Sequence, residues 1–295
     1  MRILVTASCD FQDADILTRC LLMKGHNVLF QNRVITSAVA EDFQPDVTVC
    51  YGSVAATVSD SPLVQVRSGS GGMLHRHVDL FVFSGESVIP GGFEGRAVAI
   101  SRPVDTHMFH PVAQSGEKII LALGRLDPEK GHKTFVQAMT MVNPDFRAVI
   151  AGREARYTVG QMRNYAESLG VGSRVEFVGE VEDVSPFLSC AAVGVVASLA
   201  NQPVFRAGME FMASGVPLLV AAAAGLCDYV TDGVTGLFHS PGNWKQLAGQ
   251  INHLIENCGP AGMLAGNARE YCEKHLSFES VGDRWTEVME QLSFE

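Results

Sequence analysis

The amino-acid sequence predicts an α/β fold with two domains, each built on a parallel β-sheet. Short apolar segments of strand length alternate with segments of helical spacing along the chain. The chain has 295 residues, enough for two domains of ordinary size with separate hydrophobic cores. Hydrophobic residues make up 47% of the composition and charged residues 18%, which is typical of a folded globular protein.

The N-terminal part of the chain contains the first series of predicted strands. A strand over residues 3–6 precedes a helix over 14–24, and a turn at 25–27 leads into a strand that ends at Phe30. Further strands are expected at 47–51, 63–67, 78–84 and 97–100. Strands joined by helices or short crossovers imply a parallel sheet wound in one hand. Pro111 interrupts the periodicity, so the interdomain linker is predicted at about 108–117.

The C-terminal part repeats the alternation. We expect strands near residues 118–123, 147–151, 174–178, 193–197, 217–221 and 236–239, and helices near 133–142, 157–169, 184–190, 207–214 and 243–257. A final helix over about 279–292 carries apolar side chains, from Val281 to Leu292, at helical spacing. This second series predicts another parallel sheet flanked by helices.

The segment Gly124–Gly131, with the sequence GRLDPEKG, places two cations in a turn between a predicted strand and a predicted helix. Open α/β sheets bind ligands at the carboxyl ends of their strands, where the next helix also favours an anion. The guanidinium of Arg125 grips oxygens bidentately, and Lys130 adds a point charge. The pattern indicates a diphosphate site. For this segment alone, a plain solvated loop is the alternative.

A second segment, Gly208–Val220, places Glu210 on a short helix that leads into a buried strand. Together with GRLDPEKG it resembles the nucleotide-binding half of retaining glycosyltransferases of family 4. Further matches, at 175–179 and 225–237, follow in the order typical of that family. The resemblance covers roughly residues 97–293. It implies the GT-B fold: two Rossmann-like domains with parallel sheets facing across a cleft, and a C-terminal helix that crosses back to the first domain.

The resemblance also divides the chain and assigns roles. It implies an acceptor-side domain over residues 1–112, a nucleotide-sugar-binding domain over 113–278 and a terminal helix over 279–295. Arg125 and Lys130 become catalytic residues, because they would stabilise the charge that grows on the leaving diphosphate. The other expected donor contacts are Glu210, which would accept hydrogen bonds from the ribose, and Gly124, Gly179, Glu180, Val181, Gln202, Phe205 and Gly225.

Simpler readings compete with several of these roles. Glu210 is also explained as a helix glutamate favoured by the helix dipole, and Gly179 as a glycine that ends a strand. Gln202 stands where family members usually carry a glutamate, so it keeps hydrogen-bonding capacity and loses the charge. The loop at 7–13 lacks the glycine pair that the family commonly shows there. Weak acceptor-side candidates are Gly71, Gly72 and His77, and a solvated histidine is the alternative for the last.

The predicted function is transfer of a sugar from a nucleoside-diphosphate-sugar, a UDP- or GDP-sugar, to an acceptor hydroxyl with retention of anomeric configuration. No metal-ligand cluster or cofactor motif is evident in the sequence, so we expect neither a metal nor a cofactor. Two alternatives stay open: a non-catalytic nucleotide-sugar-binding partner subunit, and a sugar epimerase or phosphorylase of the same fold. The acceptor is unknown, and a homodimer or a partner subunit is compatible with the sequence.

Charge, cysteines and hydropathy limit the partners and the location. The net charge of −10 argues against general nucleic-acid binding. Seven cysteines without paired CxxC spacing indicate reduced thiols in a cytoplasmic protein. The longest apolar runs fall short of the roughly 20 residues that span a bilayer, so no transmembrane segment is expected.

Overall fold

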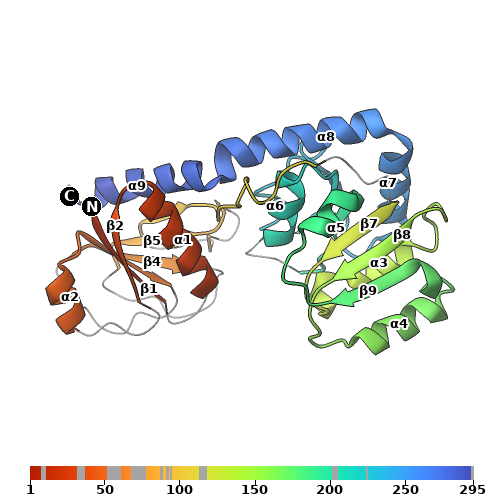
Figure 1. Cartoon of the computed structure of the whole chain (residues 1–295), viewed down its shortest axis with the longest axis horizontal. Helices are drawn as coiled ribbons and strands as arrows, with labels where there is room; N and C mark the ends of the chain where they lie inside the picture. The colour runs from red at the N-terminus through yellow and green to blue at the C-terminus, as the bar shows by residue number, and fades with distance from the viewer. Residues whose placement is uncertain are drawn as a thin grey trace. The chain divides into compact units, whose positions relative to one another are not determined.

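The computed structural model describes residues 1–7, 11–31, 37–51, 61–67, 78–86, 89–90, 93, 95–112, 118–200, 205–223 and 225–293. The chain divides into two compact units (Figure 1). One is formed by residues 1–103 together with 275–295, and the other by residues 104–274. The domain boundaries expected after residues 112 and 278 stay predictions.

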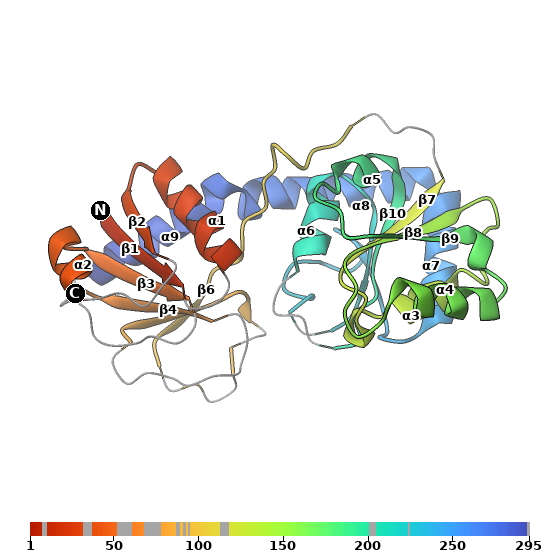
Figure 2. The same cartoon turned by 60° about the horizontal axis from the view of Figure 1, so that its bottom comes forward.

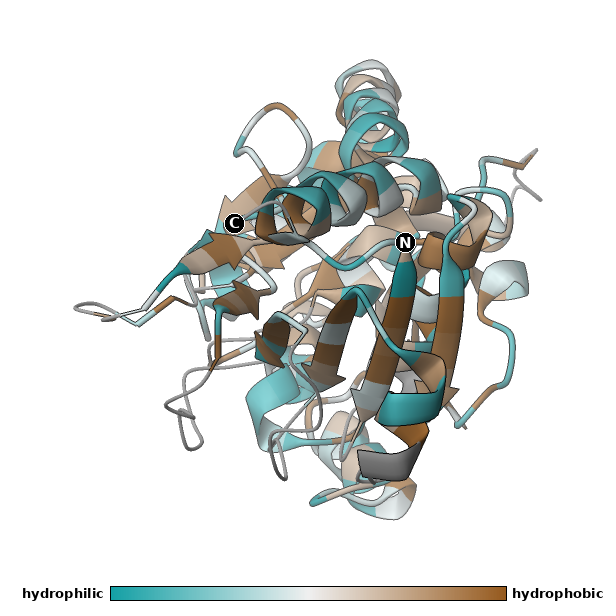
Figure 3. Cartoon of the chain, turned by 90° about the vertical axis from the view of Figure 1, so that its left-hand side faces the viewer, coloured by the Kyte–Doolittle hydropathy of each residue, from teal (hydrophilic) through white to brown (hydrophobic). Residues whose placement is uncertain are grey.

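Within the described residues, the first unit contains six parallel strands, as the sequence predicted, and their order in the sheet is β2-β1-β3-β4-β5-β6. These are β1 (Arg2–Ala7), β2 (Asn27–Gln31), β3 (Val47–Tyr51), β4 (Leu63–Arg67), β5 (Leu80–Phe83) and β6 (Ala97–Ala99). Figure 3 shows the strands as largely hydrophobic. The four inner strands, β1, β3, β4 and β5, are mostly buried, and apolar runs buried on both faces are usual for parallel sheets.

Helix α9 (Phe278–Ser293), at the end of the chain, completes the core of the first unit. It packs against α1 (Phe11–Met23), as Figures 1 and 2 show. The predicted apolar stripe is buried with side chains of α1 and of the strands: Val281, Trp285, Val288, Met289 and Leu292. The predicted return of the C-terminal helix to the first domain is confirmed. A short helix that the sequence did not predict, α2 (Ser37–Phe43), packs on the other face through Ala40 and Leu4.

The second unit contains the other sheet that the structure describes, six parallel strands in the order β12-β11-β10-β7-β8-β9. These are β7 (Ile119–Leu123), β8 (Arg147–Ala151), β9 (Val175–Gly179), β10 (Ala191–Val196), β11 (Leu218–Ala221) and β12 (Leu237–His239). Each lies within a residue or two of its predicted position. The two sheets and the α/β class are therefore as predicted.

The helices of the second unit are α3 (His132–Ala138), α4 (Val159–Ser168), α5 (Ser185–Cys190), α6 (Arg206–Ala213), α7 (Trp244–Glu256) and α8 (Cys258–Tyr271). Helices α3, α4 and α7 share one apolar core with one face of the sheet. Helix α6 covers the other face so closely that a Cβ on Gly194 of β10 would lie 2.5 Å from the Phe211 ring. That contact fixes the position of α6, the helix that carries Glu210.

The strand order of the second sheet reverses between β7 and β10. From β7 the chain proceeds to β8 and β9 on one side, and later from β10 to β11 and β12 on the other. Ligands of open α/β sheets bind beyond the carboxyl ends of the strands at such a reversal. The turn that follows β7 is Gly124–Gly131, so the fold places the two predicted cations where a ligand site is expected.

Two sequence-based expectations concern the surroundings of the protein. No helix in the described ranges is both long and apolar enough to cross a bilayer. Six of the seven cysteines lie in those ranges, and all six are free thiols. The cytoplasmic location stays a prediction.

Replacing Trp285 with alanine should destabilise the first unit. Trp285 is 4% exposed in a core shared with α1 and the sheet, and truncation of a buried tryptophan costs about 3–5 kcal/mol. Gln291→Ala changes an exposed residue of the same helix and should stay within about 0.5 kcal/mol of wild type. Urea unfolding followed by circular dichroism measures both. Equal stability of the two variants would contradict the packing described for α9.

Candidate functional site

Three adjacent strands of the second sheet end in glycine, and their backbones approach each other closely there. Gly124 follows β7, Gly152 follows β8, and Gly179 ends β9. The amide of Gly124 donates a hydrogen bond to Ala151 O (2.9 Å), and the amide of Gly152 donates to Gly179 O (2.7 Å). A Cβ on Gly152 would lie 2.0 Å from Gly124 O. A side chain at position 152 would therefore displace the start of the cation-bearing turn.

The turn after Gly124 is held equally closely against β10. It contains a single 3₁₀ turn, η2 (Pro128–Lys130), and ends at Gly131, whose φ of 68° is in the left-handed region that favours glycine. A Cβ on Gly131 would lie 1.8 Å from Ala197 O, just beyond β10. The amide of Leu199 also donates a hydrogen bond to Glu129 O (2.8 Å). The turn is thus packed between the chain segments that follow β8 and β10.

The two predicted catalytic cations differ in their surroundings. Arg125 has a side chain that is 45% exposed, so a ligand in solution can reach its guanidinium. Lys130 is half-buried, and its aliphatic stem passes beside Gly124, where an added Cβ would lie 3.7 Å from Lys130 Cδ. Burial lowers the pKa of Lys130 from its ordinary value, and the Glu129 carboxylate opposes that shift. Partial burial strengthens the interaction of the ammonium with an anion, because less water screens it.

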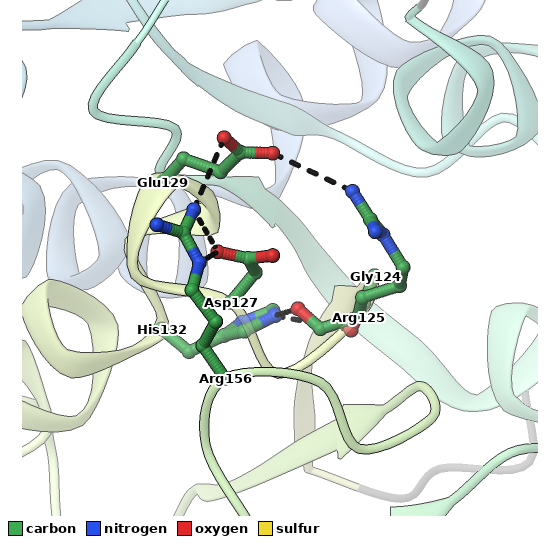
Figure 4. A network of polar contacts seen from close by, with 6 residues as sticks. All are labelled: Gly124, Arg125, Asp127, Glu129, His132 and Arg156. Atoms are coloured by element: carbon green, nitrogen blue, oxygen red, sulfur yellow. Dashed lines mark hydrogen bonds and ion pairs between the residues drawn. The ribbon is translucent and has the colours of Figure 1, made fainter.

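Acidic and basic side chains alternate around the turn (Figure 4). Arg156, from the loop after β8, donates a hydrogen bond from Nε to Oδ1 of the buried Asp127 (2.8 Å). Its Nη2 also lies 3.5 Å from Glu129 Oε2, and Glu129 Oε1 lies 3.5 Å from Arg125 Nη2. The hydrogen bond to Asp127 raises the pKa of Arg156. The long, exposed Arg125–Glu129 pair contributes little free energy, so an anionic ligand can replace Glu129 as the partner of Arg125.

Glu210, the predicted ribose ligand, lies on α6 with a half-buried side chain. In the part of the chain that the structure describes, no hydrogen bond or ion pair reaches its carboxylate. Burial raises the pKa of Glu210 to about 7, and the positive charge of Arg206, one turn earlier, partly offsets this. A desolvated carboxyl group without a partner is unfavourable for stability and is typical of ligand-binding sites.

The remaining predicted residues fall in three groups. Gly179, Glu180 and Val181 lie at the end of β9, with Glu180 exposed and Val181 half-buried, and Gly225 lies in a turn after β11. Phe205 is 2% exposed and stacks on Tyr229, with ring centroids 5.4 Å apart. A ligand contact at Phe205 would therefore have to come from its backbone. Four predicted residues lie outside the described residues: Gln202, Gly71, Gly72 and His77.

Three residues that shape this site carry no signal that the sequence made visible: Gly152, Arg156 and His132. Gly152 and Arg156 lie in the loop after β8, a strand that carried no recognised motif. His132 is buried behind the turn and bonds to its backbone. Among the described residues, no group of three or more His, Cys, Asp or Glu side chains could hold a metal ion. Independence from a metal stays a prediction.

Comparison with known proteins identifies similar sequences and folds. The model of the family described as glycosyl transferases group 1 matches residues 104–271, more than half of the chain. One relative is an uncharacterized glycosyltransferase of Methanocaldococcus jannaschii, 29% identical over 182 residues that make up 59% of this chain and 45% of that protein. The chain spans about half the length of the curated relatives it matches.

Two solved structures share the fold over almost the whole chain. A glycosyltransferase of Rickettsia africae is similar with a TM-score of 0.87 and 15% identity, over 99% of this chain and 98% of that one. HepE of Anabaena, solved in complex with UDP, is similar with a TM-score of 0.81 and 18% identity, over 99% of this chain and 100% of that one. At these identities the likeness shows the fold alone, and it confirms the predicted GT-B fold.

Gly152→Ala should destabilise the second unit and displace the turn, because the new Cβ would lie 2.0 Å from Gly124 O. We expect a loss of about 1–3 kcal/mol, as for other overpacked sites. The matched control is Gly160→Ala in α4, where the nearest atom to a Cβ is 3.9 Å away and alanine favours the helix by up to about 1 kcal/mol. Thermal unfolding measures both. A Gly152→Ala protein as stable as Gly160→Ala would contradict the close backbone approach.

Glu210 should make the ligand-free protein less stable as the pH rises. Its pKa in the folded state, about 7, exceeds the ordinary value of 4.5, so the folded state binds the proton more tightly than the unfolded state. The resulting stabilisation is complete below the ordinary pKa and is lost as the pH rises through 7. Glu210→Gln removes this dependence of stability on pH. The Tm of the variant relative to wild type should therefore increase between pH 5 and pH 8, by roughly 2–4 °C for each kcal/mol of unfolding free energy that wild type loses. An exposed control, Glu256→Gln, should show no such divergence. A constant Tm difference between Glu210→Gln and wild type would contradict the burial of this carboxyl group.

Proposed function

The chain belongs to the family of glycosyl transferases group 1, and from this premise we propose that it transfers a sugar from a nucleoside-diphosphate-sugar to an acceptor hydroxyl. The observation that carries the proposal is the placement of Arg125 and Lys130 in one turn after β7, at the strand reversal of the second sheet. Open sheets bind ligands at this position, and the two cations suit a diphosphate.

The chemistry of transfer explains why two cations are needed. As the bond between sugar and phosphate breaks, negative charge grows on the departing diphosphate, and donors placed at that charge stabilise the transition state. The exposed guanidinium of Arg125 can bind two phosphate oxygens by exchanging Glu129 for the ligand. Lys130 supplies a partly desolvated charge beside Gly124. With both cations present, we propose that the reaction needs no divalent metal ion.

Glu210 supports a nucleotide in the same site. Its carboxylate lacks a partner among the described residues, and ribose hydroxyls would supply the hydrogen bonds it needs when ionised. We place the base against the backbone at Gly179–Val181. Structures of Anabaena HepE contain UDP and UDP-glucose, so we propose a uridine nucleotide as the first donor to test. In line with the family 4 resemblance, we propose retention of anomeric configuration, with the departing diphosphate assisting removal of the acceptor proton.

A thermal-shift panel of UDP, GDP, ADP and TDP tests the proposal. A ligand at about 100 times its Kd should add about 2.7 kcal/mol of stability, and we expect one of the four to do so. Lys130→Ala should abolish the shift, because it removes the charge beside the diphosphate. Lys245→Ala removes an exposed lysine of α7 and should leave the shift unchanged.

The same protein preparation separates the remaining alternatives. Incubation with UDP-glucose and GDP-mannose should release the nucleoside diphosphate, slowly in water and faster with a suitable acceptor. Binding without release would favour the non-catalytic partner subunit, and an epimerised donor would favour the epimerase. If none of the four nucleotides stabilises the wild type, the proposed donor is wrong.

A further inference from the structure

His132 is a buried side chain that contacts the backbone of the cation-bearing turn. It is the first residue of α3 and is 4% exposed. Its Nε2 atom lies 3.1 Å from Gly124 O and 3.0 Å from Arg125 O (Figure 4). Because both neighbours are carbonyl oxygens, which only accept, Nε2 must carry a hydrogen and donate to both. The tautomer of the ring is therefore fixed by its surroundings.

The ring is also neutral at ordinary pH. Burial lowers the pKa of His132 to about 4, and the positive charge of Lys130 acts in the same direction. The two carbonyl groups oppose the shift without reversing it. His132 thus acts as a single N–H donor and adds no charge to the diphosphate site.

The two carbonyls that His132 holds belong to the peptide groups on either side of the Arg125 Cα. Fixing both peptide groups fixes the direction in which the Arg125 side chain leaves the backbone. Gly124 O is further confined by Gly152, where a Cβ would lie only 2.0 Å away. Arg125 O also accepts from the amide of Asp127 (2.8 Å). His132 therefore supports the part of the turn from which the Arg125 side chain extends.

The side chain of Lys130 lies beside the same backbone position. A Cβ on Gly124 would meet both Lys130 Cγ and His132 Nε2 at 3.8 Å, so the lysine stem and the imidazole flank one backbone position.

Within the described ranges, a second buried histidine, His239, makes no hydrogen bond to the turn through its ring. His239, at the end of β12, is 1% exposed and lies within hydrogen-bond distance of Ser240 O, the carbonyl of its own neighbour in the chain (3.1 Å from Nδ1). Burial of a histidine in this unit does not by itself entail support of the turn.

We propose that His132 is a positioning residue for the diphosphate site: by donating to the carbonyls of Gly124 and Arg125, it fixes the geometry in which Arg125 and Lys130 meet the phosphates. This role rests on the proposed function, since it presumes a diphosphate ligand. It predicts that loss of His132 weakens recognition of phosphate and leaves recognition of the nucleoside intact. A general structural role would weaken both or neither.

Binding of UDP and of uridine separates these effects. We measure UDP by isothermal titration and uridine by competition against UDP, for wild type and His132→Ala. Without the two hydrogen bonds the backbone on both sides of Arg125 loses its support, so Kd for UDP should rise about tenfold or more, and Kd for uridine should stay within about twofold. An unchanged ratio of the two Kd values in His132→Ala would overturn the proposal.

Two conservative variants give a control that does not depend on the alanine variant folding. Glutamine places its amide nitrogen near the position of His Nε2, so His132→Gln should retain most of the UDP affinity. Asparagine is equally polar, but its nitrogen lies near the position of Nδ1, so His132→Asn should behave like the alanine variant. Equal UDP affinities of the two variants would overturn the positioning role.

Failure of the inference differs from failure of the proposed function. His239→Ala is the control: it should lower Tm and leave the ratio of the Kd values for UDP and uridine as in wild type. If His239→Ala changes this ratio as His132→Ala does, the role is not specific to His132. If the wild-type protein binds GDP instead of UDP, the same measurements are made with GDP and guanosine. Wild type that binds no nucleoside diphosphate would overturn the proposed function together with this inference. Normal binding with an unchanged ratio in the His132 variants overturns the inference alone.

Discussion

The close backbone packing around the turn Gly124–Gly131 is the constraint on which the rest of the site depends. Two points of contact leave no room for a Cβ: Gly152 against Gly124 O, and Gly131 against Ala197 O. They lie on opposite sides of the turn, one beyond β8 and one beyond β10. Because backbone positions cannot yield as flexible side chains do, the turn has little freedom to shift. The strand reversal therefore carries a rigid support for its two cations.

The charged side chains around this turn have different roles, one structural and one in ligand binding. Arg156 is engaged by the buried Asp127, and this pair joins the loop after β8 to the start of η2. Among the residues that the structure describes, the guanidinium of Arg125 has only the long contact to Glu129, in the exposed part of the network. Exposed ion pairs contribute little, whereas an ion pair with a buried partner is costly to break. The network thus keeps Arg156 in a structural role and leaves Arg125 available to an anion.

The sequence predicted the strands of both sheets, since a buried parallel strand is an apolar run with clear ends. It missed α8 because Gly259, Pro260, Gly262 and Gly266 lower its helix propensity, and burial of Ala261, Leu264, Ala265 and Ala268 decides the helix. The motif around Arg125 and Lys130 was visible because its residues are contiguous. The sequence did not reveal the roles of Gly152, Arg156 and His132. These roles arise from contacts with residues that are not their neighbours in the sequence: the end of another strand, a carboxylate or a backbone carbonyl. Such contacts leave no periodic pattern in the sequence.

The helix that carries Glu210 is tied to both ends of the second unit. Arg269 of α8 donates hydrogen bonds to Thr106 O (3.1 Å), Phe109 O (2.6 Å) and Ala213 O (2.6 Å). The first two acceptors lie in the segment by which the chain enters this unit, and the third ends α6. Helix α8 itself leads to the point where the chain leaves the unit, through the π-helical turn η4 (Cys272–Leu276). The Arg269 guanidinium therefore connects α8 by hydrogen bonds to the segment that enters the unit and to the end of α6. The position of α6, and with it the burial of the Glu210 carboxyl group, is thereby linked to both connections of the unit.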